Sequence, residues 1–345
     1  MKALWFQHDD TRGAPRQPPA LAFKEGKGHL SVNPIYGCSL GCPYCINQAD
    51  GVGSARRQLA PVPSLLDALE RNASIARRLR LSVLDFCDPF DPTVAPVLRE
   101  LLEGIAARLP RQVVLLTTRL HPGVERLDWL ASLELRASVF VSLGDAAGPV
   151  PPITSVERRL ALLADCRERG LHAAMLLRPL AREWTDPEAL RRLLSGAQAD
   201  EVVVSGLIRS PEIDAGLKAR GWPVPAVSGA DLEPSLQREV LGLAGEVLPG
   251  VPVSAHRSCA INRRWGLPCL VLRSQAKAGW SAGAPATGDD APPVPRLCRC
   301  WGDVRMEAPA GPPVPRLCRC WGDVRMEATA EKPTRGGYCQ FKVAA

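Results

Sequence analysis

Three cysteines at short spacing carry the chemistry that the sequence shows most plainly. The stretch Asn33–Cys45 reads NPIYGCSLGCPYC, which places Cys38, Cys42 and Cys45 in a C-x3-C-x2-C arrangement. Thiolates this close can bind three irons of a [4Fe–4S] cluster, while this loop offers no ligand for the fourth iron. The spacing therefore predicts an iron–sulfur cluster with one vacant iron.

The vacant iron indicates a class of reaction. A low-potential cluster can bind the amino and carboxylate groups of S-adenosylmethionine there and pass an electron to its sulfonium, so that the C5′–S bond breaks. The resulting 5′-deoxyadenosyl radical must be kept from water and directed at a substrate C–H bond. Gly37 and Gly41 suit such a loop, because glycine adopts positive φ angles readily.

A structural zinc site is the main alternative for these cysteines. Zinc prefers four ligands in paired C-x2-C or Cys/His spacings, and no clear fourth ligand follows nearby. Inert buried cysteines would have no reason to gather in one short loop. A non-catalytic zinc-binding or interaction protein remains the rival interpretation of the whole chain.

The elements that must position this loop alternate between short apolar runs and longer amphipathic ones. This alternation predicts an α/β fold with six βα units, which close into a partial (βα)6 barrel of the TIM type. The expected strands are His29–Tyr36, Leu81–Asp88, Gln112–Arg119, Ala137–Gly144, His172–Leu180 and Glu201–Ile208. The expected helices are Ser64–Leu79, Val94–Leu109, Val124–Leu135, Ser155–Arg169 and Pro187–Gly196, followed by a helix Glu233–Val247 and a short strand Val251–Ser254.

The cysteine loop after the first strand, Tyr44 before the last cysteine and the six βα units resemble the radical SAM superfamily over about residues 29–210. The resemblance implies that Cys38, Cys42 and Cys45 bind the cluster and that Tyr44 lies near the adenine. The opening NPIYGC, the stretch DPFDP at 88–92 and the segment SCA at 258–260 are most similar to the spore photoproduct lyase-like group. That group more often reads NPYxGCxHxCxYC, and this chain departs from the pattern, for example at Ile35.

Polar residues at the carboxyl ends of barrel strands are candidate cofactor ligands. Asp88 could accept a hydrogen bond from the methionyl ammonium, or it could cap the Asp-Pro turn. Ser142 could touch the ribose, and Arg178 could pair with the methionyl carboxylate. Thr117 and Thr118 could face the substrate, although β-branched residues are ordinary in a strand.

Cys87 has two possible roles. As a catalytic residue it could donate a hydrogen atom to a substrate radical, since the S–H bond is weak. A free cysteine is also one of the residue types most often buried, where it packs as a small apolar side chain. Cys166, in the middle of an expected helix, is predicted to lie in the core.

The chain is expected to divide into an N-terminal extension (1–28), the barrel (29–210), a C-terminal extension of the barrel (211–275) and a linker with a Cys-rich tail (276–345). In the tail, Pro292–Ala308 and Pro312–Ala328 both read PPVPRLCRCWGDVRMEA, a repeat with a period of 20. An unchanged repeat favours a recent duplication. The tail cysteines could form an auxiliary metal site with Cys259 and Cys269; those in the tail are Cys298, Cys300, Cys318, Cys320 and Cys339.

The remaining expectations concern location and partners. No apolar run reaches the roughly 20 residues of a membrane span and no signal-peptide core is present, which predicts a cytoplasmic protein without a membrane partner. Arginines often stand beside acids in the sequence, a pattern typical of solvated helix faces. The net charge of +7 is nevertheless compatible with a nucleic-acid substrate, and a peptide is the alternative substrate. The chemistry calls for an external electron donor such as a flavodoxin or ferredoxin.

Overall fold

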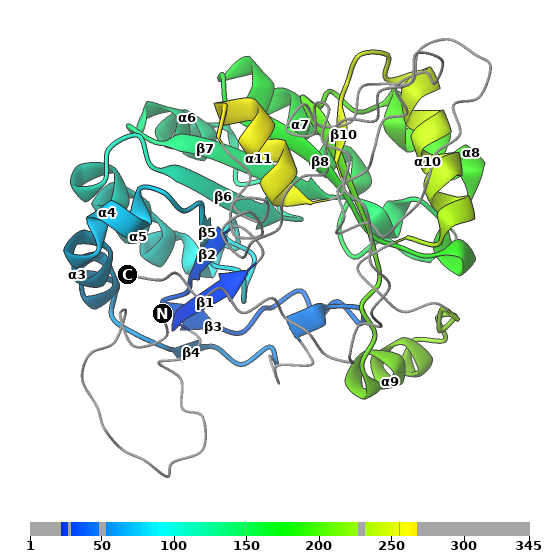
Figure 1. Ribbon diagram of the computed structural model, residues 1–345. Helices are drawn as coiled ribbons and strands as arrows, with labels where there is room; N and C mark the ends of the chain where they lie inside the picture. The colour runs from blue at the N-terminus through cyan, green and yellow to red at the C-terminus, as the bar shows by residue number, and fades with distance from the viewer. Residues whose placement is uncertain are drawn as a thin grey trace, which may run out of the picture.

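The computed structural model describes residues 22–26, 29–47, 53–148, 150–226, 232–254 and 256–267. Eight strands form one sheet in the order β1-β2-β5-β6-β7-β8-β9-β10, in which β1 is antiparallel to β2 and every other pairing is parallel. The strands are β1 Phe23–Gly26, β2 His29–Val32, β5 Leu81–Val83, β6 Val113–Thr118, β7 Arg136–Ser142, β8 His172–Leu180, β9 Glu201–Gly206 and β10 Val253–Ser254. The partial-barrel α/β fold predicted from the sequence is confirmed (Figure 1).

Helices follow most of the parallel strands. The last described helix, α11, lies apart from the other helices. They are α3 Val62–Arg71, α4 Ala73–Ala76, α5 Ala95–Arg108, α6 Val124–Ser132, α7 Val156–Glu168, α8 Pro187–Ser195, α9 Pro211–Ala219, α10 Pro234–Val247 and α11 Arg257–Trp265. Short 3-10 helices are η2 Pro92–Val94, η3 Gly144–Ala146 and η4 Arg182–Trp184. The helix α11, yellow in Figure 1, crosses the face of β6–β8 opposite to α6 and α7.

Apolar side chains alternate between the two faces of each strand, and this alternation explains why the sheet has an apolar core on either face. On β6, Val114 and Leu116 belong to the large core shared with the outer helices, whereas Leu115 faces the inner side. The inner face is filled by apolar side chains that pack against Ala260 and Ile261 of α11. Since successive side chains of a strand point to opposite faces, each strand contributes to both cores.

Two predicted strands are shorter than expected. The strand predicted for Leu81–Asp88 ends at Val83, because Leu84 has a φ of 61° and the chain turns there. The Asp85 amide donates to Asn33 Oδ1 at 2.8 Å, which fixes the turn against the first strand. The run His29–Tyr36 is divided into β2 and β3 (Ile35–Tyr36), and β3 pairs with β4 (Arg57–Gln58) in a separate two-stranded sheet.

Helix ends follow the sequence signals in one case and depart from them in another. Ser155 Oγ accepts the Arg158 amide at 3.1 Å and begins α7, and Gly170 follows its end with a φ of 71°. The expected start at Ser64 is wrong, since α3 begins at Val62 directly after Pro61. Proline at the first turn of a helix loses no hydrogen bond, so Pro63 favours the earlier start.

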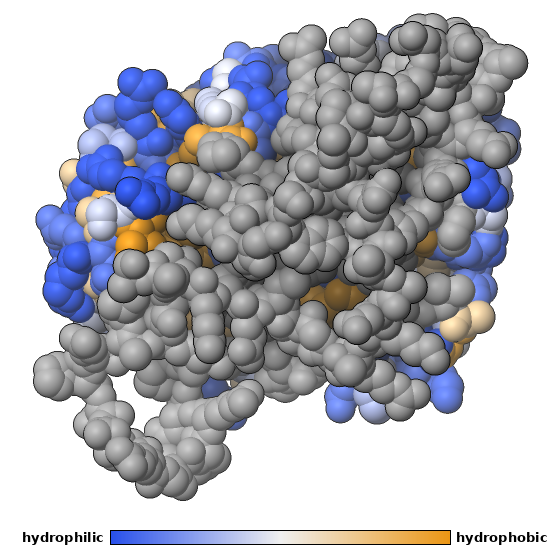
Figure 2. Space-filling model, in the orientation of Figure 1, coloured by the Kyte–Doolittle hydropathy of each residue, from blue (hydrophilic) through white to orange (hydrophobic). Residues whose placement is uncertain are grey.

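The outer surface of the described part is mainly polar. In Figure 2 hydrophilic residues line the outer edges of the described part of the molecule. Among the residues the structure describes, Val124 is the single large hydrophobic side chain classed as exposed, at 46%. No helix in the described ranges is long and apolar enough to cross a membrane. The repeat and the tail cysteines lie outside the described residues.

Candidate active site

The three cysteines of the N-terminal loop have free thiols and lie beyond the carboxyl end of β2, after the short strand β3. Cys42 is buried, and Cys38 and Cys45 are half-buried. The Cys38 amide donates to Gly53 O at 3.1 Å, and the Cys45 amide donates to Cys42 O at 3.1 Å. Gly37 has a φ of 105°, and a Cβ there would lie 2.3 Å from Ala55 O, so only glycine fits this turn.

The thiols are close enough for each to affect the ionisation of its neighbours. Burial raises the pKa of Cys42 to about 11; Arg119 opposes this rise, and Cys45 and Cys38 add to it. Burial also raises the pKa of Cys38, although the backbone amides of Leu40 and Asp88 act in the opposite direction. A metal cluster binds thiolates, so its binding must release protons from these sulfurs. The described residues contain no group of three or more Cys, His, Asp or Glu side chains that could hold a single metal ion.

Asp91 fastens the cysteine loop to the segment after β5. The Ser39 hydroxyl donates to Asp91 Oδ2, and the Arg56 guanidinium reaches the same oxygen at 2.5 Å. The Thr93 amide donates to Asp91 Oδ1 at 2.9 Å. Burial alone would raise the pKa of Asp91, but these hydrogen bonds and Arg56 lower it to about 2. The loop is therefore held by an ionised carboxylate.

Asp88 lies in the loop after β5 and not at a strand end, which corrects the sequence-based placement. Its Oδ1 accepts from the Phe90 amide at 3.0 Å and from Thr118 Oγ1 at 2.6 Å, and its Oδ2 accepts from the Arg119 amide at 2.7 Å. These bonds match the capping role that the sequence left open, and they join the loop to the end of β6. Its proposed contact with the methionyl ammonium stays a prediction.

Cys87 is 7% exposed and belongs to the large core. Its thiol lies 3.9 Å from Leu84 O, and burial raises its pKa, with the neighbouring Cys38 adding to the rise. The residue thus packs as a small apolar side chain at the back of the cysteine loop. Hydrogen-atom donation by Cys87 stays a prediction. Cys166 is fully buried in α7, as predicted.

Ser142 and Arg178 meet at the carboxyl edge of the sheet. Ser142 ends β7, and its hydroxyl donates to Arg178 O at 3.2 Å. The guanidinium of Arg178 is half-buried, and within the described part of the chain it has no hydrogen bond or ion pair. Burial and the nearby Arg257 lower its pKa to about 10, while Cys45 acts in the opposite direction. A cation without a partner beside Cys45 is suited to bind a carboxylate.

Tyr44 is buried in an aromatic group that sequence reasoning missed. Its ring lies 5.8 Å from that of Trp222 and 6.0 Å from that of Trp184, measured between centroids. The Arg119 guanidinium covers the Tyr44 ring at 5.3 Å. Both tryptophans come from segments without a local motif, so spacing in the sequence offered no signal for them.

A second group of contacts that the sequence did not predict joins α11 to the strand ends. Arg257 Nη1 donates to Thr117 Oγ1 at 2.6 Å and lies 3.3 Å from Asp85 Oδ1. Ser82 Oγ donates to Asp85 Oδ1 at 2.6 Å, and Ser31 also donates to this carboxylate. Burial would raise the pKa of Asp85, but Arg257 and His29 outweigh it and the pKa is lowered. Thr117 therefore binds the last helix, and its expected contact with substrate stays a prediction.

The arrangement of sheet, outer helices and cysteine loop can be compared with solved structures. A spore photoproduct lyase mutant with dinucleoside spore photoproduct is 14% identical to this chain and aligns over 72% of it and 88% of the other chain, with a TM-score of 0.51. The chain has the fold of spore photoproduct lyase. A mutant of that lyase with bound AdoMet and dinucleoside spore photoproduct is also 14% identical and aligns over 67% of this chain and 78% of the other, with a TM-score of 0.50.

The fold of spore photoproduct lyase is the one that the cysteine loop and the six βα units predicted, so the resemblance is confirmed at the level of the fold. A radical S-adenosylmethionine methyltransferase from Kitasatospora setae is 20% identical over 56% of this chain and 38% of the other, with a TM-score of 0.43, which is too low to carry an argument. No family model and no curated protein sequence matches the chain.

Proposed function

We propose that the chain is a radical SAM enzyme that cleaves S-adenosylmethionine reductively and removes a hydrogen atom from a substrate, as a lyase or in another radical transformation. The observation that carries the proposal is the grouping of three free thiols beside the Arg178 guanidinium, which has no partner among the described residues, at the carboxyl edge of a barrel-type sheet. A cluster takes each thiolate on a separate iron, so its ligands need not converge on one point.

The residues of the chain have distinct parts in this proposal. Cys38, Cys42 and Cys45 would hold a [4Fe–4S] cluster, which supplies one electron to the sulfonium of S-adenosylmethionine. Arg178 would bind the methionyl carboxylate through a charge-assisted pair. Ser142, held against the Arg178 backbone at 3.2 Å, would fix that edge of the cofactor site.

The aromatic group around Tyr44 and the contacts of Asp91 with the cysteine loop would protect the reaction. Tyr44, 4% exposed, and Trp184, 1% exposed, pack with Cys42 and keep water from that side of the cysteine loop. Asp91 holds the loop in place through Ser39 and Arg56. Exclusion of water matters because a carbon radical must meet its substrate before it meets solvent or another donor.

Two classes of substrate are proposed, the same two that the sequence left open. Solved structures of spore photoproduct lyase hold a dinucleoside spore photoproduct, which supports a nucleic-acid lesion for this chain. A peptide is the second candidate. Binding to oligonucleotides at 50 and 200 mM salt separates the two, because contacts to phosphate weaken as salt rises. An external reductant such as a flavodoxin or ferredoxin would deliver the electron.

Anaerobic reconstitution with iron and sulfide tests the enzyme proposal. We expect about four irons and four sulfides per chain, and release of 5′-deoxyadenosine after addition of dithionite and S-adenosylmethionine. Cys42→Ala should lose both, whereas Cys166→Ala, which removes a buried thiol in α7, should keep both. A cluster that forms without yielding 5′-deoxyadenosine contradicts the proposal.

The rival interpretation predicts a different metal content. A non-catalytic zinc protein would contain zinc and no sulfide after anaerobic purification. A structural zinc ion needs four donors around one point, and no such group is present in the ranges that the structure describes. Metal and sulfide analysis of the full chain therefore decides between the two interpretations, including any auxiliary metal held by the tail cysteines.

A further inference from the structure

Arg119 is held rigidly at the end of β6, directly before the chain leaves the sheet. Its amide donates to Asp88 Oδ2 at 2.7 Å, and its carbonyl oxygen accepts from Thr154 Oγ1 at 3.0 Å. Asp88 itself is fixed by Thr118 and by the Phe90 amide. The backbone of Arg119 is therefore anchored on both sides by buried or half-buried groups.

The guanidinium of Arg119 lies against the cysteine loop. It covers the ring of Tyr44 at 5.3 Å from the centroid, and Tyr44 stands between Cys42 and Cys45 in the chain. The Arg119 Nε is buried and has no hydrogen-bond partner within the part of the chain that the structure describes. A guanidinium in this position can act on the cysteine sulfurs as a fixed charge, because the planar group stays protonated under all ordinary conditions.

No carboxylate among the described residues binds the guanidinium of Arg119. The carboxylate of Asp145 is already bound to Arg159 Nη1 at 2.6 Å, and both side chains of that pair are fully buried. The carboxylate of Asp88 is bound to the Arg119 amide and to Thr118. Among the described residues no ion pair of Arg119 occurs. Burial would lower the pKa of Arg119, but its neighbours Tyr44, Cys42 and Asp145 raise it, so the guanidinium stays charged.

We propose that Arg119 sets the reduction potential of the cluster held by Cys38, Cys42 and Cys45, by placing an unpaired positive charge over the Tyr44 ring. The inference rests on the proposed function. One-electron reduction of the cluster, from [4Fe–4S]2+ to [4Fe–4S]1+, adds a negative charge to the site. A nearby cation stabilises the reduced form, and net charge around a cluster is one of the factors that fix its potential.

Removal of this charge should make the cluster harder to reduce. A fixed unit charge beside a half-buried site changes an equilibrium constant by about tenfold or more. A tenfold change corresponds to about 59 mV for a one-electron couple. We therefore expect the potential of Arg119→Gln to be about 59 mV lower than that of the wild type, and the potential of Arg119→Lys to stay close to it.

The test is a titration of the reconstituted full chain with dithionite, without S-adenosylmethionine, followed by the electron paramagnetic resonance signal of the reduced cluster. Arg191→Gln is the matched control, since it removes the same charge from the exposed face of α8. Iron and sulfide content is measured for every variant. If neither Arg119→Gln nor Arg119→Met binds the cluster while Arg119→Lys does, the charge serves assembly and the proposal is wrong.

Other outcomes separate this inference from the proposed function. If the wild type forms a cluster and cleaves S-adenosylmethionine but Arg119→Gln has an unchanged potential, only the role of Arg119 fails. If the potential is unchanged and the affinity for S-adenosylmethionine falls, Arg119 binds the cofactor instead and the inference is likewise wrong. If the wild type assembles no cluster, both proposals fall.

Discussion

The buried pair of Arg159 and Asp145 should be one of the most sensitive points of the fold. Arg159 Nη1 lies 2.6 Å from Asp145 Oδ1 and 2.7 Å from Ser142 O, and its Nη2 lies 2.9 Å from Thr154 O. Both side chains of the pair have 0% exposure. Arg159→Met leaves the carboxylate of Asp145 buried without its bonded cation, and it also removes the donor to three backbone carbonyls, since Arg159 Nε donates to Ser155 O as well.

Breaking a buried ion pair by removing one partner costs about 3–5 kcal/mol, because the remaining charge is left uncompensated. We expect the free energy of unfolding of Arg159→Met to fall by about this amount at pH 7, measured by urea denaturation with circular dichroism. The double variant Arg159→Met/Asp145→Leu should recover much of the loss, since it leaves no buried charge. Arg191→Met, which breaks an exposed pair with Glu246, should match the wild type within error.

The pair also has a defined pH dependence. Burial would raise the pKa of Asp145, but Arg159 and Arg119 outweigh it and the folded-state pKa is lowered. A carboxyl group with a lowered folded pKa adds stability above its unfolded pKa of about 3.9, and the addition is lost as the pH falls through the folded value. The pair should therefore contribute fully at pH 5–8. A loss below 1 kcal/mol in Arg159→Met at pH 7, or no recovery in the double variant, would refute this reasoning.

Three further outcomes are expected. His172 Nδ1 lies 2.9 Å from Ser138 Oγ, and burial lowers the pKa of His172 to about 4. The contribution of the neutral imidazole to the free energy of unfolding is therefore complete above pH 6.5 and is lost as the pH falls toward 4. His172→Phe should remove up to roughly 3 kcal/mol of this pH dependence in urea titrations at pH 7, 5.5 and 4.5; an unchanged pH profile would contradict the assignment. Arg178→Gln should weaken binding of S-adenosylmethionine to the reconstituted protein by about tenfold or more without loss of iron, as measured by calorimetry, and equal affinity would remove Arg178 from the cofactor site. Asp88→Asn should lower the free energy of unfolding by about 1–3 kcal/mol, because the amide cannot accept on both atoms; a variant as stable as the wild type would show that the three hydrogen bonds are dispensable.

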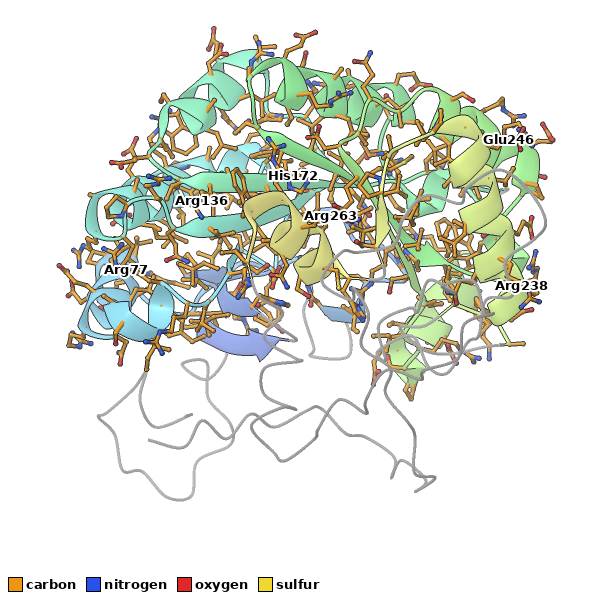
Figure 3. All side chains as sticks on the ribbon, turned by 45° about the horizontal axis from the view of Figure 1, so that its top comes forward. Arg77, Arg136, His172, Arg238, Glu246 and Arg263 are labelled. Carbon is orange, nitrogen blue, oxygen red and sulfur yellow. The ribbon has the colours of Figure 1, made fainter. Side chains whose placement is uncertain are left out.

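Several features that organise the site depend on contacts between distant segments. Arg257 reaches Asp85 across 172 positions of sequence, and Arg80 donates to Asn262 at 2.6 Å across 182. Arg263 is paired with the buried Glu201 on the inner face of the sheet, where Figure 3 labels Arg263 and His172 beside α11. No local pattern in the sequence predicts such pairs, because each partner on its own is an ordinary polar residue.

Local chemistry determined what the sequence alone could reveal. The spacing of Cys38, Cys42 and Cys45, the alternation of strands and helices and the end of α7 just before Gly170 are set by neighbours in the chain. The structure agrees with the fold that they predict. Tertiary structure decided which charges stand near that loop. Arg119 lies over Tyr44 of the cysteine loop, and Thr118 and the Arg119 amide bind Asp88 of the loop after β5, since only the folded chain brings these distant segments together.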